Sequence, residues 1–243
     1  MDLNSLFNVK DKIVLITGGS RGIGLMIATG FIANGAKVYI SSRSKDTCDK
    51  VAKELSDKGP GKAVSIPVDL QHLNEVKRLA NEIKEREGKL HVLVNNAGGN
   101  WSAPIASYPD AAFEKAASPK DPARVINIGS ISGLTTPMSE TYAYSTSKAA
   151  LHHLTRVMAG KLSNRQITFN NIAPGPYQSK MMAQTLKDHG DLIIADVPLG
   201  RIGAAEDIAG TAIYLSSKAG AFTNGATITV DGGITSRPIN SKI

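Results

Sequence analysis

A chain of 243 residues is long enough for one large α/β domain with a substantial core, and its 42% hydrophobic and 20% charged residues are ordinary for a globular protein. The net charge of +7 comes from 28 basic and 21 acidic residues, but the lysines are spread out and only 5% of the residues are aromatic. Because there is neither a basic stripe nor a stacking platform, we expect no nucleic-acid partner and interpret the charge as a surface that attracts phosphate-bearing ligands.

Membrane, disulfide and metal chemistry are also disfavoured by the sequence. No apolar run is long enough to span a bilayer, and residues 1–12 lack the apolar core of a signal peptide, so we expect no membrane partner. The single cysteine, Cys48, excludes an internal disulfide and fits a reducing compartment. We interpret Cys48 as a solvated helix residue, with a reactive thiol as the alternative. The five histidines show no metal-ligand spacing, so no metal site is expected.

Short β-branched runs alternate with helical patterns along the chain. The expected strands are nearly continuous apolar runs, which is typical of parallel strands covered on both faces. This alternation predicts right-handed βαβ units in a single Rossmann-type domain over 1–243, with a doubly wound parallel sheet. Weak patterning in 181–198 makes about 177–198 a candidate substrate lid. Strands are expected at 12–17, 37–41, 62–67, 91–95, 124–128, 167–172 and 227–230, and helices at 22–34, 47–58, 73–87, 139–162 and 204–215.

A glycine-rich loop joins the first expected strand to the first helix. It reads Thr17-Gly18-Gly19-Ser20-Arg21-Gly22-Ile23-Gly24. Glycine permits a tight turn and lets the backbone approach a pyrophosphate at a helix N-terminus, where free N–H groups point outward. Three glycines alone fit an ordinary strand-to-helix turn. The strand before and the helix after favour a dinucleotide site.

The end of the second strand indicates which dinucleotide binds. An acidic residue here would hold the ribose 2′-hydroxyl of NAD, whereas this strand ends Ser41-Ser42-Arg43. Arg43 and Arg21 are suited to grip a 2′-phosphate through paired hydrogen bonds. The alternative is two solvated surface arginines. The missing acid favours NADP(H).

Candidate catalytic side chains lie on and before the long helix expected at 139–162. Tyr144 and Lys148 are one turn apart on one helix face. A phenol titrates near pH ~10, so acid–base work at neutral pH requires a nearby positive charge such as a lysine ammonium. A Tyr/Lys pair at this spacing is common by chance. Ser130, just after strand 124–128, supplies a hydroxyl for a substrate oxygen, and Ser132 is a weaker candidate.

These motifs together resemble those of the classical short-chain dehydrogenases/reductases. The similarity covers nearly the whole chain, and 123–130 and 142–144 look closest to the branch of rhamnolipid-type 3-oxoacyl reductases. The motifs that carry it are Thr17-Gly18-x-x-x-Gly22-x-Gly24, Asn95-Asn96-Ala97-Gly98, Ser130, Tyr144-x-x-x-Lys148, Asn171-x-x-Pro174-Gly175 and Asp231-Gly232-Gly233.

The resemblance implies a catalytic role for three residues. Tyr144 is expected to be the general acid during reduction, Lys148 to bind the ribose hydroxyls and favour ionisation of the tyrosine, and Ser130 to polarise the carbonyl.

The resemblance also implies an NADP(H) site along the motifs. Some of its members have ordinary alternatives: Asp69 as a turn acid, Ser179 as a helix cap, and Thr17 as a strand-end residue. The implied cofactor-binding residues are Thr17, Gly18, Ser20, Arg21, Gly22, Ile23, Gly24, Ser42, Arg43, Asp69, Leu70, Asn95, Ala97, Gly98, Tyr144, Lys148, Pro174, Gly175, Tyr177 and Ser179.

The resemblance fails between the fourth and fifth strands. The family has a long helix there, with a catalytic asparagine that supports a water chain behind the lysine. This chain is roughly two dozen residues shorter, has room for about two helical turns before Pro119, and has no asparagine at that position. Either the protein lacks the helix, which exposes apolar sheet, or the sequence is joined across a missing stretch near 116–118. The intact motifs favour the second, which predicts consecutive Cα atoms there farther apart than ~3.8 Å.

The expected activity is NADPH-dependent reduction of a ketone, either a 3-oxoacyl thioester or another carbonyl compound, to a secondary alcohol. One alternative is an alcohol dehydrogenase working oxidatively, which Arg21 and Arg43 disfavour because cellular NADP is mostly reduced. Another is a catalytically silent NADP-binding regulator, which only the missing asparagine favours. An enoyl reductase is less favoured because Tyr144 stands where carbonyl chemistry places its acid. The substrate pocket is expected to be built by loops 99–108, 134–141 and 177–198. The sequences of such loops diverge freely, so no specific substrate is predicted.

The sequence also gives indications of self-association and of cellular location. Small and apolar residues on the long helix predict a homodimer or homotetramer, the alternative being that they face the sheet. The ending Ser241-Lys242-Ile243 is one conservative step from the peroxisomal Ser-Lys-Leu signal, so both a cytoplasmic and a peroxisomal location stay open. The helix residues are Ala143, Ser147, Ala150, Leu151 and Leu154.

Overall fold

The computed structural model describes residues 2–97, 118–137 and 141–237. Within them, seven parallel strands form one sheet in the order β3-β2-β1-β4-β5-β6-β7. The order reverses between β1 and β4, which is the switch point of a doubly wound sheet. The predicted Rossmann-type fold is confirmed. The strands are β1 Ile13–Thr17, β2 Lys37–Ser41, β3 Lys62–Ser65, β4 Val92–Asn95, β5 Ala123–Ile128, β6 Ile167–Pro174 and β7 Thr227–Val230.

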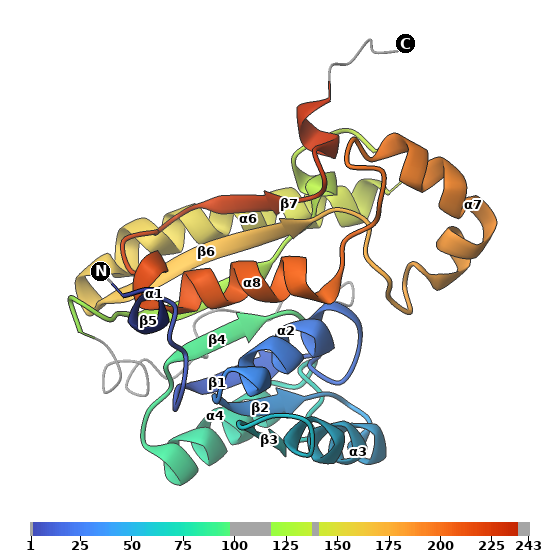
Figure 1. Ribbon diagram of the computed structural model, residues 1–243. Coiled ribbons are helices and arrows are strands. Elements are labelled where there is room, and N and C mark those ends of the chain that lie inside the picture. Colours follow the sequence, from blue (N-terminus) through green and yellow to red (C-terminus); the bar gives the residue numbers. More distant parts are fainter. Residues whose placement is uncertain (1, 98–117, 138–140, 238–243) are drawn as a thin grey trace.

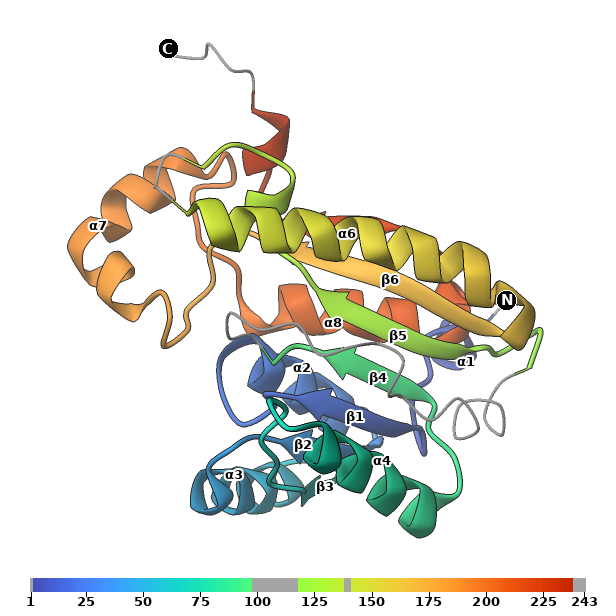
Figure 2. The same ribbon diagram turned by 180° about the vertical axis from the view of Figure 1, so that it is seen from behind.

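Helices cover both faces of the sheet (Figures 1 and 2). Helices α2, α3 and α8 pack on one face and α4 and α6 on the other, as the two buried clusters show. None of the helices in the described residues is long and apolar enough to cross a bilayer. The helices are α1 Leu3–Leu6, α2 Gly22–Ala33, α3 Lys45–Ser56, α4 Leu73–Glu87, α6 Tyr142–Leu162, α7 Ala183–Asp196 and α8 Ala205–Ser216, with short 3-10 turns η2 Ile131–Gly133, η3 Ser163–Arg165, η4 Lys218–Gly220 and η5 Ile234–Ser236.

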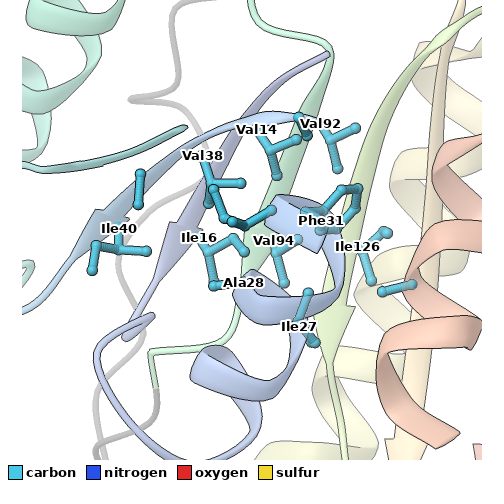
Figure 3. Packing of buried hydrophobic residues seen from close by; sticks show 14 of the residues in the cluster. Val14, Ile16, Ile27, Ala28, Phe31, Val38, Ile40, Val92, Val94 and Ile126 are labelled. Carbon is cyan, nitrogen blue, oxygen red and sulfur yellow. The ribbon is translucent and has the colours of Figure 1, made fainter. Parts of the chain in front are cut away.

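The alternation of strand side chains explains why both faces are apolar. In β1, Val14 and Ile16 contribute to the core under α2, whereas Ile13 and Leu15 contribute to the core under α4. Figure 3 shows the first of these cores, where Phe31 of α2 lies against the strands. A strand that is buried on both faces, as β1 is, tends to be apolar at nearly every position, which is the pattern expected from the sequence.

The prediction that Cys48 is solvated is wrong. Cys48 is fully buried on α3, and its Sγ lies 3.4 Å from the carbonyl oxygen of Ile40. Together with Ala52 and Leu55 it forms the buried face of the helix. The spacing of these three residues is that of one helix face, so the sequence contained the signal.

The candidate lid region contains a helix that the sequence analysis did not predict. Helix α7 has a break at His189 (φ −136°), and none of its residues is buried. Figure 1 shows α7 standing out from the sheet. The weak pattern of apolar residues in α7 has a physical cause. A helix with no buried face does not need its apolar residues on one side.

Residues 98–117, which include much of the region where the resemblance fails, lie outside the described residues. The expected chain break near 116–118 therefore falls mostly outside them too. The description resumes at Ser118, which pairs with Asp121 just before β5.

Candidate active site

The candidate residues gather at the carboxyl edge of the sheet. Because all strands run parallel, the loops that follow β1, β2, β4, β5 and β6 emerge at this one edge. The register pairs Thr17 at the end of β1 with Ser41 at the end of β2, and Asn95 of β4 with Asn127 of β5. Motifs far apart in the sequence therefore become neighbours.

The side chain of Asn96 is hydrogen-bonded to the backbone of the glycine loop. The Asn96 side-chain nitrogen donates to the carbonyl oxygens of Thr17 and Gly18, at 2.9 and 3.2 Å. A Cβ atom on Gly24 would collide with this nitrogen, and Gly18 and Gly22 have φ of +66° and +52°. Glycine is favoured at these positions, because it has no Cβ and adopts a positive φ without strain. Asn96 was not among the predicted site residues.

The start of α2 fits a phosphate group. Its N-cap residue Arg21 makes no side-chain capping hydrogen bond, and the first turn holds no acidic side chain. The N–H groups of this turn therefore have no side-chain acceptor and form the positive end of the helix dipole. The side chain of Ser179 lies alongside, 3.4 Å from where a Cβ of Gly22 would be.

The two candidate phosphate-binding arginines lie on neighbouring loops. Arg43 follows β2 and is exposed, as is Arg21. The Gly18 N–H donates to the Ser41 carbonyl oxygen at 2.7 Å, which ties the end of β1 to the end of β2. The two guanidinium groups thus come from adjacent strand ends, with Ser42 between Arg43 and the sheet.

The side chains of three predicted cofactor-binding residues accept hydrogen bonds from backbone N–H groups of the protein. The Thr17 hydroxyl accepts from the N–H groups of Asn96 and Ala97, at 3.1 and 3.0 Å. The Asp69 carboxylate accepts from the Gln71 N–H at 3.1 Å. The Ser179 hydroxyl accepts from the N–H of Met182 at 3.2 Å. Each of them therefore supports the local backbone.

Tyr177 is placed in the core. Its side chain is 2% exposed, and a Cβ on Gly203 would collide with its ring. Its hydroxyl is buried without a hydrogen-bond partner, and burial followed by the charge of Asp207 raises its pKa.

The other predicted positions differ in burial. Pro174 ends β6, and Gly175 packs against Asp231, whose carboxylate accepts from two N–H groups of the following turn. Gly98 lies outside the described residues. Ser20 is buried, while Ile23 and Leu70 pack partly buried against the two core clusters.

Tyr144 and Lys148 meet on α6 as the spacing predicts. The Lys148 ammonium lies 5.6 Å from the centroid of the Tyr144 ring. It donates to the Ile128 carbonyl oxygen at 2.8 Å. Burial lowers the pKa of Lys148. The ammonium and the phenol ring therefore lie side by side on one face of the helix.

Ser130 lies at the same end of β5. It is 8% exposed, begins η2, and its hydroxyl accepts from the Ser132 N–H at 3.2 Å. Lys148 binds the carbonyl of Ile128, two residues earlier, so Ser130 and the Tyr144–Lys148 pair share one corner of the sheet.

Comparison with known proteins identifies the family. A family model described as "Enoyl-(Acyl carrier protein) reductase" matches residues 18–235. The chain is 40% identical over 255 aligned positions to the rhamnolipids biosynthesis 3-oxoacyl-[acyl-carrier-protein] reductase of Pseudomonas aeruginosa, covering 95% of this chain and 99% of the relative. It is 32% identical to the short-chain dehydrogenase/reductase PhomF of Diaporthe leptostromiformis, covering 94% and 92%. This chain belongs to the short-chain dehydrogenase/reductase family.

A solved structure of the family supports the assignment. The Pseudomonas aeruginosa RhlG/NADP active-site complex superposes with a TM-score of 0.87 at 38% identity, covering 95% of this chain and 99% of that one. As a short-chain dehydrogenase/reductase, the protein is an oxidoreductase. The 255 positions aligned with the Pseudomonas reductase exceed the 243 residues of the chain, so that relative has residues with no counterpart here.

Proposed function

We propose that this protein is an NADPH-dependent reductase that converts a ketone, either a 3-oxoacyl thioester or another carbonyl compound, into a secondary alcohol. The convergence of Tyr144, Lys148 and Ser130 at the end of β5 carries this proposal. The glycine loop at the start of α2 fits a dinucleotide at the same edge of the sheet. The names of the Pseudomonas reductase and of the RhlG/NADP complex agree with it.

Each catalytic residue has one task in this proposal. The Tyr144 hydroxyl donates a proton to the carbonyl oxygen, and the Lys148 ammonium stabilises the phenolate left behind. The Ser130 hydroxyl holds the same oxygen as it gains negative charge. The nicotinamide, when bound, supplies the hydride.

The test follows NADPH absorbance with three kinds of substrate: a 3-oxoacyl thioester, simple ketones and an enoyl thioester. We expect oxidation of NADPH with ketones. The enoyl thioester is included because the matching family model is described as an enoyl reductase. NADPH oxidation with the enoyl thioester alone contradicts the proposal, and so does no oxidation with any of the three.

Replacing Arg43 by alanine is expected to weaken NADPH binding by roughly 10- to 100-fold, because a hydrogen-bonded charged group contributes about 1.5–3 kcal/mol. Affinity for NADH, which lacks the 2′-phosphate, is expected to stay unchanged. Titration of both nucleotides measures the effect. Lys53→Ala removes the same charge from the exposed end of α3 and is the matched control. Equal affinity of the wild-type protein for NADPH and NADH contradicts the assignment.

We also propose that about 177–198 is a substrate lid. Its first part lies against the glycine loop through Ser179 and Gly22, and α7 has no buried residue that anchors it to the core. Because Tyr177 and Val197 near its two ends are buried, only the part between them, which includes α7, opens at little cost in free energy. Hydrogen exchange in α7 that slows on adding NADPH and a substrate supports this lid, and unchanged exchange contradicts it.

Self-association through α6 is part of the proposal. Ala143, Ser147 and Ala150 are exposed and Leu154 is 36% exposed, so these four side chains do not face the sheet, whereas Leu151 is partly buried. We expect a dimer or tetramer at micromolar concentration, and a monomeric mass in solution contradicts this.

A peroxisomal location rests on Ser241-Lys242-Ile243 alone, which lies outside the described residues. Imaging the protein with an N-terminal tag distinguishes it from a cytoplasmic one.

A further inference from the structure

A buried histidine lies directly behind the candidate catalytic serine. His152 is on α6, one turn after Lys148 and two turns after Tyr144, so the three share a helix face. It is 2% exposed. Its Nε2 accepts a hydrogen bond from the Ser130 N–H at 3.5 Å.

The imidazole occupies a space that two glycines leave free. A Cβ on Gly129 would collide with the His152 Nε2, and a Cβ on Gly133 would lie 3.0 Å from its Cε1. Gly129 precedes Ser130, and Gly133 ends the η2 turn that Ser130 begins. The serine is thus flanked on both sides by backbone that fits closely around this ring.

The hydrogen bond from Ser130 to His152 lies just past the end of β5, where neighbouring strands no longer provide carbonyl acceptors. The Gly129 N–H donates to Ile172 of β6 at 2.8 Å. The next N–H, that of Ser130, lies beyond both the β4–β5 pairing, which ends at Asn95 and Asn127, and the β5–β6 pairing, which ends at Ile128 and Ile172. The ring therefore connects Ser130, two residues after the end of β5, to the helix that carries Tyr144 and Lys148.

We propose that His152 is a positioning residue for the reduction, which sets the place of Ser130 relative to the Tyr144–Lys148 pair by accepting the Ser130 N–H. This inference rests on the proposed function for its kinetic consequences, but the hydrogen bond itself is independent of it. His152 does not touch the substrate oxygen in this scheme; it acts through Ser130 alone.

The protonation state of His152 agrees with an acceptor role. Burial, followed by the charges of Lys148 and Arg156, lowers its pKa, so the ring is neutral near pH 7 and Nε2 is free to accept. The segment 129–133 against which it packs has no titratable side chain. Its Nδ1 is buried without a hydrogen-bond partner. An unsatisfied buried donor destabilises a fold, so the imidazole is not the residue that stability alone favours here.

The test compares two substitutions that separate positioning from packing. His152→Leu fills the space without an acceptor, and His152→Gln keeps an acceptor near the position of Nε2 without titrating. For His152→Leu we expect kcat of ketone reduction to fall about five- to tenfold, with NADPH affinity unchanged and thermal stability equal or higher. His152→Gln is expected to recover kcat to within about twofold. His153→Leu, a change at the adjacent exposed histidine, is the matched control and should behave as the wild type.

Hydrogen exchange supplies a readout that needs no turnover. In His152→Leu the Ser130 amide is expected to exchange faster than in the wild type, whereas in His152→Gln it stays protected. Unchanged kcat in His152→Leu, equal loss in both variants, or loss of stability and NADPH binding together with kcat would overturn the proposal. If the wild-type protein reduces no ketone, the proposed function fails. The exchange measurement then decides alone, and unchanged Ser130 exchange in His152→Leu rejects the hydrogen bond.

Discussion

Tyr144→Phe is expected to lower kcat of ketone reduction roughly 10²–10⁴-fold, the range that a positioned general acid contributes. The variant loses only the hydroxyl that donates the proton, while the ring that lies 5.6 Å from the Lys148 ammonium is retained. NADPH affinity is therefore expected to change by less than about twofold. Stopped-flow measurement of NADPH oxidation gives kcat, and a separate NADPH titration gives the affinity.

Tyr142→Phe is the control for this experiment. Tyr142 begins the same helix but is 76% exposed, so removal of its hydroxyl should leave both kcat and NADPH affinity unchanged. Substantial turnover by Tyr144→Phe would falsify the proposed mechanism. A large loss in both variants would instead mean that the start of α6 is sensitive to any change, and the acid would have to be sought elsewhere.

The second large effect concerns stability, at the opposite edge of the sheet from the candidate site. Both oxygens of the Asp121 carboxylate accept from the Lys12 ammonium at 3.0 Å, and Oδ1 also accepts from the Arg124 guanidinium. Arg124 is 1% exposed and also donates to the carbonyl oxygens of Pro122 and, at 2.8 Å, Ser217. One partly buried carboxylate thus balances two buried cations.

Asp121→Ala is expected to lower the free energy of unfolding by about 3 kcal/mol, the low end for a broken buried ion pair because the Asp121 side chain is 37% exposed. Its loss leaves the Lys12 and Arg124 charges buried and uncompensated. Urea denaturation at pH 7 measures the change. Glu54→Ala breaks the exposed Lys50–Glu54 pair and should cost less than about 0.5 kcal/mol. Equal effects of the two substitutions contradict this account.

The same carboxylate gives a pH dependence of known sign. Burial alone would raise the pKa of Asp121, but the charges of Arg124 and Lys12 outweigh it and hold the pKa below the ordinary 3.8. A carboxyl with a depressed pKa in the folded state contributes its full stability above its unfolded pKa. That contribution is lost as the pH falls through the lower, folded-state pKa. The difference in free energy of unfolding between the wild-type protein and Asp121→Ala is therefore expected to shrink only in strongly acidic solution.

Much of the fold and part of the site follow from local sequence. The apolar runs of β1 and β4 and the period of α4 and α6 appear in the sequence because a strand covered on both faces, or a helix with one buried face, favours them. The spacing of Tyr144 and Lys148 places them on one helix face whatever surrounds the helix. The glycines of the first loop mark backbone that a side chain would block.

Other features depend on which segments become neighbours in space. Asn96 holds the glycine loop because β4 pairs with β1, and Asp121 joins Lys12 across 109 residues of sequence. The same applies to Tyr177, whose burial depends on the approach of Gly203. No local period encodes such contacts, because they arise only when the sheet assembles.

The sequence by itself determined the alternation of strands and helices apart from α1 and α7, the parallel sheet and the residues that could perform acid–base chemistry. The tertiary structure alone decided that His152 lies behind Ser130, where the side chains absent from Gly129 and Gly133 make room for it. The physical reason is that hydrophobic periodicity reports which face of an element is buried, whereas it does not report what that face meets. A buried polar group finds its partner only in the assembled fold, and that partner decides what the group can do.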